Sequence, residues 1–323
     1  MSRLTAKRFA GNRWIQPALL AGVVVSPVSA EAQPTPPAAT PLAPTLITYT
    51  AEANDRMTVP VMVAGRGPYR FMVDTGANRT ALARGLANSL RLRPGPLAEI
   101  NSLTGASQAE TVNVPHLAFT KVAMTGLEAV ILDGADIGAD GVLGTDGLAG
   151  QRIQFDFDRR TMSIAPATTF DPTDVTGAIE ILGHRRNGRL VLTNASTIDH
   201  SLVVVVDTGA EITVGNAALR AALARRGLSG EIRPSLLISV TGAKLAGDSM
   251  ILRKLNLGAV SINNLEVVFA PARTFSQLHL EERPALLLGM NALRAFRKVS
   301  IDFARMRFRV VPPGEALAEG SQR

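Results

Sequence analysis

FMVDTGANRTAL, at residues 71–82, returns as VVVDTGAEITV, at residues 204–214, in the second half of the chain. Each copy is an apolar run that leads into Asp-Thr-Gly-Ala, and a threonine follows three residues later as Thr80 or Thr213. A stretch that occurs twice in similar surroundings indicates that a structural unit occurs twice. The sequence therefore predicts two related lobes, each with one copy of the motif.

The segments around the two copies also match, and they match in the same order. Two strand-like segments precede each motif. Each motif is followed by a short helical stretch, a Thr-Gly turn, an apolar run before glycine and an alternating segment that we interpret as one strand. The matching pairs are TLITYT (45–50) and AIEIL (178–182), MTVPVMV (57–63) and RLVLTN (189–194), ALARGLANSL (81–90) and NAALRAALARRG (216–227), SLTGAS (102–107) and SVTGAK (239–244), GVLGTDGL (141–148) and LLLGMNAL (286–293), and FDFDRRTMSI (155–164) and IDFARMRFRV (301–310). This pattern predicts an all-β protein with short helices.

The first 32 residues have the pattern of a secretory signal. A basic start from Arg3 to Arg13 precedes an apolar run from Ile15 to Val25, and small residues follow. The apolar run is shorter than the roughly 20 residues that a membrane-spanning helix needs, although an uncleaved anchor stays an alternative. We expect a periplasmic or secreted protein with no membrane span once the leader (1–32) is removed.

The predicted domain boundaries follow from the repeat and from the composition between its parts. A proline-rich spacer at 33–44 precedes a first lobe at 45–166, and a linker at 167–176 precedes a second lobe at 177–312. A tail that we expect to be disordered completes the chain at 313–323.

The composition excludes several kinds of site. The 323 residues include no cysteine, which excludes disulfides, cysteine nucleophiles and thiolate metal ligands. The four histidines are scattered without metal-ligand spacing, and Asp133, Asp136 and Asp140 lack the spacing of an EF-hand, so we interpret these aspartates as an exposed loop. The net charge is +7, but aromatic residues are only 4% and no basic run is interleaved with them. We therefore expect no metal, no cofactor and no nucleic-acid partner.

Over roughly residues 45–311, the two motifs and their surroundings resemble the pepsin/retropepsin-like aspartic peptidases of a bacterial type. The resemblance implies a two-lobed acid-protease fold, a pseudo-twofold pair of retropepsin-like β-barrel lobes with short helices. It implies that Asp74 and Asp207 are catalytic and that Thr75 and Thr208 hydrogen-bond reciprocally between the lobes. It also implies that the apolar-Gly elements at 142–144 and 287–289 pack beside the catalytic loops and that the substrate is a peptide or protein.

Two adjacent aspartates suit the hydrolysis of a peptide bond. The reaction needs an activated water molecule and a proton donor for the leaving nitrogen. Two carboxyl groups about 3 Å apart cannot both ionise, so they share one proton, and aspartic proteases are the standard example of such a pair. The ionised group takes a proton from water while the protonated group hydrogen-bonds the substrate carbonyl. The sequence therefore predicts an aspartic endopeptidase that is complete as a monomer.

The residues next to each aspartate refine this prediction. Gly76 and Gly209 allow the backbone to turn sharply and bring amides toward the carboxylates. Ala77 and Ala210 lack the hydroxyl that follows Asp-Thr-Gly in many pepsins, so one hydrogen bond to the charged form is missing. Its loss raises the pKa of the pair, and we expect an optimum at mildly acidic pH, less extreme than that of pepsin.

Candidate flap residues lie in the two Thr-Gly turns. They are Thr104 and Gly105 in the first repeat and Thr241 and Gly242 in the second, and neither turn has the tyrosine of a pepsin flap. An ordinary glycine-containing turn is the alternative interpretation. The lobes also differ beside the motif, with Arg79 in one and Glu211 in the other, so we expect an asymmetric cleft.

Other interpretations of the same residues stay open. An Asp-Thr-Gly segment also caps turns, and the same fold could serve as a non-catalytic periplasmic binding or dimerisation module. A two-carboxylate glycosidase would need carboxyl groups at least about 5 Å apart. The repeated Asp156 and Asp302 are interpreted as strand-end residues in solvent or in turns. A basic C-terminal region is interpreted as a solvated face; it comprises Arg297, Lys298, Arg305, Arg307 and Arg309.

Overall fold

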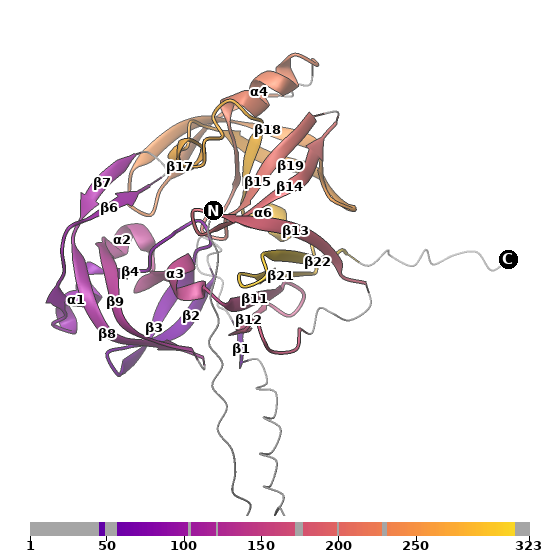
Figure 1. Ribbon diagram of the computed structural model, residues 1–323. Coiled ribbons are helices and arrows are strands. Elements are labelled where there is room, and N and C mark those ends of the chain that lie inside the picture. The colour runs from indigo at the N-terminus through magenta and orange to yellow at the C-terminus, as the bar shows by residue number, and fades with distance from the viewer. Residues whose placement is uncertain are drawn as a thin grey trace, which may run out of the picture. The chain divides into compact units, whose positions relative to one another are not determined.

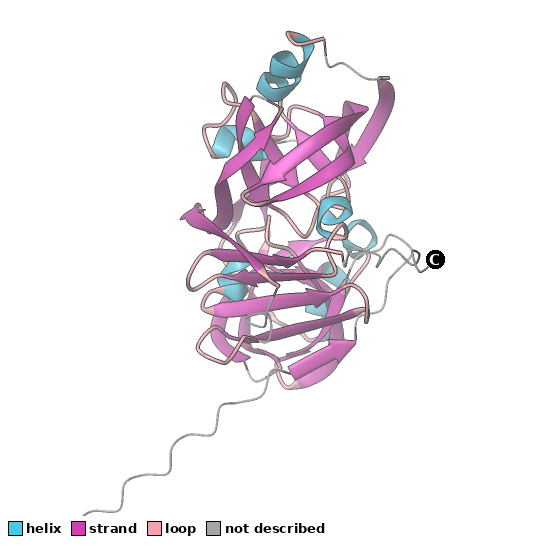
Figure 2. Ribbon diagram, turned by 90° about the vertical axis from the view of Figure 1, so that its right-hand side faces the viewer, coloured by secondary structure: helices cyan, strands magenta, loops and turns pink. Residues whose placement is uncertain are grey.

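The computed structural model describes residues 45–48, 57–102, 105–120, 122–171, 177–198, 200–227 and 231–313, and for 45–48 it describes the backbone only. These residues belong to one unit of the chain, which runs from Pro41 to Arg323. The predicted leader, the spacer and all of the predicted tail except residue 313 lie outside the described residues. Strands predominate and the helices are short (Figure 1, Figure 2).

Six strands of the first lobe close into a barrel. β2 pairs with both β3 and β8, so the order β2-β3-β10-β4-β9-β8 returns to its first strand. The strands are β2 (Thr58–Val63), β3 (Arg66–Val73), β4 (Ala81–Ala83), β8 (Thr111–Phe119), β9 (Val122–Leu132) and β10 (Gly141–Leu143), and β5 (Arg93–Pro94) extends the sheet beside β8. Buried Val59, Val61 and Val63 alternate with exposed residues along β2, as expected for a strand with one face in the core.

The second lobe repeats this barrel strand for strand. Its order is β14-β15-β20-β16-β19-β18, and a β14–β18 pairing closes it. The strands are β14 (Arg189–Thr197), β15 (His200–Val206), β16 (Thr213–Gly215), β18 (Lys244–Leu257), β19 (Val260–Phe269) and β20 (Ala285–Leu288), and β17 (Arg233–Ile238) pairs with β18 at the edge. The internal repeat and the two-lobed all-β fold predicted from the sequence are confirmed.

Six antiparallel strands join the lobes, and they continue through the pairing of β13 with β14 into the sheet of the second barrel. Their order is β1-β12-β11-β21-β22-β13, with three strands from each lobe, and β11 pairs with β21 at the centre. The strands are β1 (Thr45–Thr48), β11 (Gln151–Asp156), β12 (Thr161–Pro166), β13 (Ile179–Arg186), β21 (Lys298–Asp302) and β22 (Arg307–Val311). Ile153 lies opposite Ile301 across the central pair, and both are fully buried. The apolar core therefore continues from one lobe into the other.

A buried ion cluster holds the start of the predicted linker against this sheet. Asp171 accepts from Arg309 at 2.8 Å and from Ser300 at 3.3 Å, and Arg152 lies 3.5 Å away. Asp171 and Arg152 are each 4% exposed, so neither charge is solvated. Removing one partner from such a cluster leaves an uncompensated buried charge, and residues 167–171 are thus a fixed part of the fold.

Residues 155–164 and 301–310 form hairpins, and the prediction of one alternating strand in each was wrong. Asp156 accepts the amide of Arg159 in the first turn, and Asp302 accepts those of Ala304 and Arg305 in the second. The expected turn position is right, but the two aspartates are 8% and 4% exposed and do not face solvent. The apolar positions shift by one residue at each turn, from Phe155 and Phe157 to Met162 and Ile164 in the first hairpin, and the prediction overlooked this change of phase.

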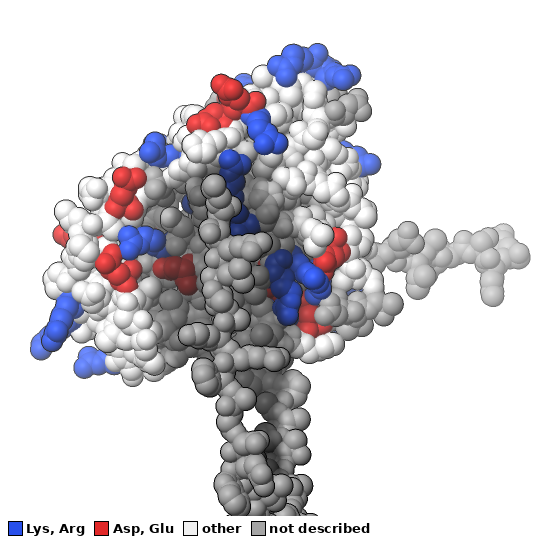
Figure 3. Space-filling view, in the orientation of Figure 1, with Lys and Arg blue, Asp and Glu red and all other residues white. Residues whose placement is uncertain are grey.

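The basic C-terminal region, which the sequence predicted as a solvated face, is a band of ion pairs whose cations range from about half exposed at Arg297 to largely buried at Arg309. Its pairs are Arg297 with Asp158, Lys298 with Asp156, Arg305 with Asp302, Arg307 with Glu180, and Arg309 with Asp171 and Glu180. Asp302 lies three residues from Arg305, whereas the other acidic partners are distant in the sequence and reach the region through the interlobe sheet. On the described surface in Figure 3, basic and acidic side chains are interspersed.

Among the described residues, six short helices connect the strands, and one small hairpin lies outside the barrels. They are α1 (Arg84–Ser89), α2 (Gly134–Ile137), α3 (Thr145–Leu148), α4 (Ala217–Ala224), α5 (Arg273–Gln277) and α6 (Met290–Leu293), and the hairpin is β6 (Ala98–Asn101) with β7 (Ala106–Ala109). The interpretation of three aspartates as an exposed loop was wrong in part, because Asp136 lies within α2 and Asp133 caps it, while Asp140 follows the helix and accepts the amide of Arg70.

Candidate active site

Asp74 and Asp207 occupy equivalent positions, each directly after a barrel strand. Asp74 follows β3 and its amide donates to the carbonyl of Leu143 at 3.0 Å. Asp207 follows β15 and donates to Leu288 at the same distance. Leu143 and Leu288 end β10 and β20, which run parallel to β3 and β15. The apolar-Gly elements therefore pack beside the motif loops, as the family resemblance implied.

The two motif loops are joined by reciprocal threonine hydrogen bonds. The hydroxyl of Thr75 donates to the carbonyl of Val206 at 2.9 Å and accepts the amide of Thr208 at 3.0 Å. The hydroxyl of Thr208 donates to Val73 at 2.8 Å and accepts the amide of Thr75 at 3.1 Å. Thr75 is 0% exposed and Thr208 is 7% exposed. This network fixes the two aspartates relative to each other.

Thr75→Val is expected to lower the free energy of unfolding by about 2–4 kcal/mol, since it leaves a buried amide and a buried carbonyl without partners. The substitution keeps the shape of the side chain and removes only the hydroxyl. Urea denaturation measures the change, and Thr75→Ser, which retains the hydroxyl, is the control. A negligible loss in Thr75→Val together with a large loss in Thr75→Ser would show that packing of the methyl group, and not the hydrogen bonds, holds the loops together.

Each aspartate is held by two amides of its own loop. Oδ1 of Asp74 accepts from Gly76 at 2.8 Å and from Ala77 at 3.0 Å. Oδ1 of Asp207 accepts the corresponding amides of Gly209 and Ala210 at 3.0 and 3.1 Å. The equivalent geometry on both sides gives each carboxyl group a fixed orientation.

The structure brings the two carboxyl groups together. The side chains of Asp74 and Asp207 lie close enough to share a proton, and they are 7% and 8% exposed. Each motif glycine lies against the opposite aspartate: a Cβ on Gly76 would be 2.4 Å from Oδ1 of Asp207, and one on Gly209 would be 2.2 Å from Cγ of Asp74. Only a residue without a side chain permits this approach.

Burial and mutual repulsion favour a proton on the pair. Burial is the main cause that raises the pKa of Asp74, against the loop amides and Arg189, which lower it. Burial and then the negative charge of Asp74 raise the pKa of Asp207 to about 7. Two carboxyl groups in contact titrate as one system. The arrangement therefore retains one proton in a pH range where isolated aspartates are fully ionised.

Arg189 is a site residue that the sequence interpretation missed. It begins β14 directly after the Asn187-Gly188 turn, is 4% exposed, and its Nε donates to the carbonyl of Gly76 at 2.7 Å. Its charge lowers the pKa of both aspartates, and desolvation lowers its own pKa. A repeated arginine could have revealed it, because Arg56 and Arg189 each lie eighteen residues before an aspartate. Arg56 is outside the described residues.

A cavity of about 630 Å³ opens at the pair. Its lining includes Asp74, Asp207 and Arg189 at the base and Ser102 from the first lobe, and the remaining wall comes largely from the second lobe. In the second lobe, residues 235–240 of β17 and its turn form one side. The volume is within the range of about 300–1,000 Å³ that is usual for small-molecule sites.

The flap candidates lie in hairpin turns, although their exact surroundings differ. Gly105 lies in the β6–β7 turn, and Thr104 is outside the described residues. Thr241 and Gly242 lie in the β17–β18 turn, whose neighbouring residues 239 and 240 line the cavity. Gly242 has φ +73°, and a Cβ there would lie 2.6 Å from the Asp136 carboxylate. The second-lobe turn therefore contacts α2 of the first lobe.

The described residues lack two further features. They contain no group of three or more His, Asp or Glu side chains arranged to hold a metal ion. None of their helices has the length and apolar character required to cross a membrane.

Comparison with known proteins identifies the repeated unit. The family model described as aspartyl protease matches the chain twice, over residues 59–146 and 194–292, which together are more than half of its length. Each match begins in the first strand of a barrel and extends beyond the apolar-Gly element, and so contains one Asp-Thr-Gly. No curated protein matches the chain.

Proposed function

Since the chain belongs to the aspartyl protease family, we propose that it is an aspartic endopeptidase in which Asp74 and Asp207 together activate one water molecule. The ionised carboxyl group takes a proton from the water molecule while the oxygen of that water attacks the peptide carbonyl carbon. The protonated carboxyl group donates a hydrogen bond to the carbonyl oxygen, on which negative charge develops. Transfer of a proton to the nitrogen then allows the C–N bond to break, and the pair again holds one proton.

The observation that carries this proposal is the contact between two buried carboxyl groups at the base of an accessible cavity. If the two aspartates only capped turns, they would need hydrogen bonds from their loop amides. They would not need to contact each other between the lobes or to face an open cavity. The raised pKa values favour the singly protonated state that the reaction requires.

Digestion of a peptide library by the purified mature protein tests the proposal. We expect internal cleavage that a statine-type inhibitor abolishes, because its hydroxyl group mimics the tetrahedral intermediate. Cleavage that resists the inhibitor but stops with a metal chelator or a serine-directed reagent would assign the activity to another class. Peptide binding without cleavage at any pH would instead favour a non-catalytic binding module.

The pH dependence is expected to be a bell with its maximum at mildly acidic pH. Activity requires one proton on the pair, so it is lost when both groups are protonated at low pH and when both are ionised at high pH. Both pKa values are raised above the ordinary 3.8, that of Asp207 to about 7, so the bell lies in this range. The kcat/KM measured across pH checks it, and a maximum below pH 3.8 would contradict it.

The variant Arg189→Met tests how this arginine influences the pH dependence of the activity. Arg189 lowers the pKa of both aspartates, so its removal raises both, and the two limbs of the bell should move to higher pH. Arg225→Met, at the exposed end of α4, is the control and should leave the limbs in place. An unchanged profile in Arg189→Met would mean that this arginine does not influence the ionisation of the pair.

We also propose that the protein acts as a monomer outside the cytoplasm. One chain contains both aspartates, so no second subunit is required. The basic start and apolar run of the first 32 residues support export. N-terminal sequencing of the protein recovered from cell fractions, together with its mass in solution, tests both statements.

A further inference from the structure

The two lobes carry a glutamate at the same barrel position but surround it differently. Ala81, which follows Thr80, pairs with Val130 on β9, and Val214, which follows Thr213, pairs with Val268 on β19. Glu128 lies two residues before Val130, and Glu266 lies two residues before Val268. The two glutamates are therefore equivalent. The same count aligns Arg79 with Ile212 and Asn78 with Glu211, so the contrast of Arg79 with Glu211 drawn from the sequence was displaced by one residue.

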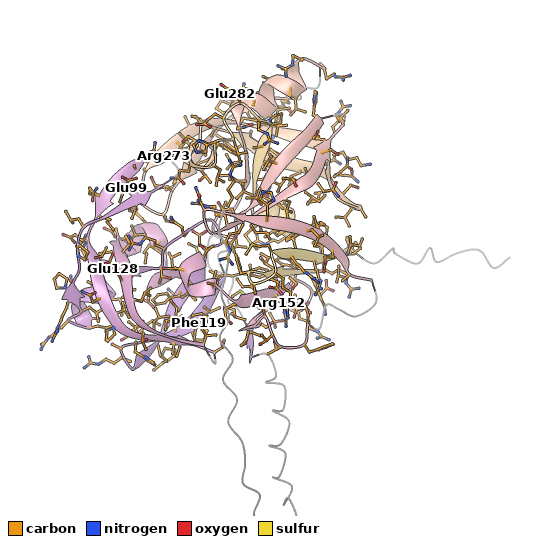
Figure 4. The ribbon with its side chains drawn as sticks, viewed as in Figure 1. Glu99, Phe119, Glu128, Arg152, Arg273 and Glu282 are labelled. Carbon is orange, nitrogen blue, oxygen red and sulfur yellow. The ribbon has the colours of Figure 1, made fainter. Side chains whose placement is uncertain are left out.

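In the first lobe this glutamate is neutralised outside the cavity. Nη2 of Arg79 lies 2.7 Å from Oε1 of Glu128, and both side chains are about one-third exposed. Neither residue is part of the cavity lining. Figure 4 marks Glu128 on the first lobe.

In the second lobe the equivalent glutamate lines the cavity and lacks that arginine. Ile212 occupies the position of Arg79 and supplies no charge. The Glu266 carboxylate accepts a hydrogen bond from Ser249 at 2.6 Å, and its residue is exposed. A neutral hydroxyl satisfies one lone pair but leaves the negative charge of Glu266 at the cavity wall.

A second carboxylate lies on the same wall. Glu211, four residues after Asp207, is exposed and lines the cavity, and its side chain has no hydrogen bond or ion pair within the described part of the chain. Asn291 links the two glutamates: its amide donates to the carbonyl of Glu211 at 3.0 Å, and its Nδ2 donates to the carbonyl of Glu266 at 2.9 Å. The two carboxylates therefore belong to neighbouring residues of one surface.

The cations near this wall have other contacts. Arg233 pairs with Glu231 at 3.0 Å on the exposed end of β17, although Glu266 also acts on its charge. Arg294 lines the cavity too and has a contact of its own. Arg189 faces the aspartates at the base. No ion pair among the described residues contains Glu211 or Glu266, so a positive charge brought by the substrate can pair with both carboxylates.

We propose that Glu211 and Glu266 form a subsite for a cationic side chain, so that the enzyme prefers a lysine or arginine of the substrate beside the bond that it cleaves. This inference rests on the proposed peptidase function and adds the class of substrate. Ile212, also in the lining, would contact the aliphatic part of such a side chain.

The test uses paired peptides that differ only in lysine or norleucine at each position near the cleavage site. We expect wild type to show a higher kcat/KM for lysine at one position. Since an exposed ion pair changes affinity by about two- to fivefold, Glu211→Gln and Glu266→Gln should each reduce the lysine-to-norleucine ratio by that factor. Ile212→Arg, which restores the first-lobe pair, should reduce it too, and Glu128→Gln is the matched control.

A binding measurement separates failure of this inference from failure of the proposed function. Asp74→Asn protein, which should bind without cleaving, is titrated with the same peptides. Cleavage by wild type with equal rates for both peptides, or with a ratio that both glutamine variants leave unchanged, would overturn the subsite and leave the peptidase standing. If wild type cleaves no peptide, the proposed function fails, and equal Kd values for lysine and norleucine peptides would overturn the subsite as well.

Discussion

Asp74→Asn is expected to lower kcat/KM by at least about 10³-fold, in line with the loss of a general acid–base group, while the fold stays intact. An amide cannot hold the shared proton or accept one from water. Its Oδ1 can still accept the amides of Gly76 and Ala77, which hold the carboxylate in the wild type at 2.8 and 3.0 Å. Steady-state cleavage of a library-derived peptide measures the loss, and circular dichroism checks the fold.

The control for this variant is an aspartate outside the cavity. Asp158 pairs with Arg297 at the surface, and both side chains are nearly half exposed. Asp158→Asn should therefore retain the wild-type rate. Residual activity above about one-tenth in a correctly folded Asp74→Asn protein would be inconsistent with general acid–base catalysis by this residue.

Gly209→Ala is the second change with a large expected effect. The added Cβ would lie 2.2 Å from Cγ of Asp74, so the carboxyl group or the loop has to move. A displacement of about 1 Å in an active site costs about 10²-fold in rate, and overpacking costs about 1–3 kcal/mol of stability. We therefore expect both kcat/KM and the melting temperature to fall, with the loss of rate being the larger effect.

Gly85→Ala is the matched control, since it makes the same chemical change where space is open. No atom lies within 4 Å of a Cβ at Gly85, which is the second residue of α1. Replacing a helical glycine by alanine typically adds about 0.5–1 kcal/mol of stability. Full activity in Gly209→Ala would show that the loop tolerates a side chain and that the close approach is dispensable.

Much of the fold could be predicted because the sequence repeats one structural unit. Short-range patterns identified β2 and β14, the helices that follow the motifs, and the apolar-Gly elements, since each depends on residues close in sequence. At 155–164 and 301–310 the prediction missed the turns, because each half alternates by itself and only a one-residue shift of the apolar positions marks the turn between the strands. Closure of each barrel by β2–β8 and β14–β18 depends on long-range pairing, to which short-range patterns are insensitive.

Sequence analysis found the two motif loops of the candidate site but not the residues that surround them. Asp74, Asp207 and their loop residues lie in one repeated motif, so the sequence alone could bring them together. Arg189 lies on a different strand and reaches Gly76 only through the packing of two lobes. The burial of Asp156 and Asp302 likewise follows from the interlobe sheet, which no local pattern contains. Charge pairing and burial arise from tertiary structure, whereas motif geometry is local.

The central claim is that the two carboxyl groups work as one unit. A comparison of Asp74→Asn, Asp207→Asn and the double variant tests it most directly through kcat/KM under one set of conditions. Residues that act as a unit are strongly non-additive, so the double variant should be no slower than either single variant. Substantial cleavage by one of the single variants, or a double variant whose loss equals the product of the single losses, would contradict the account.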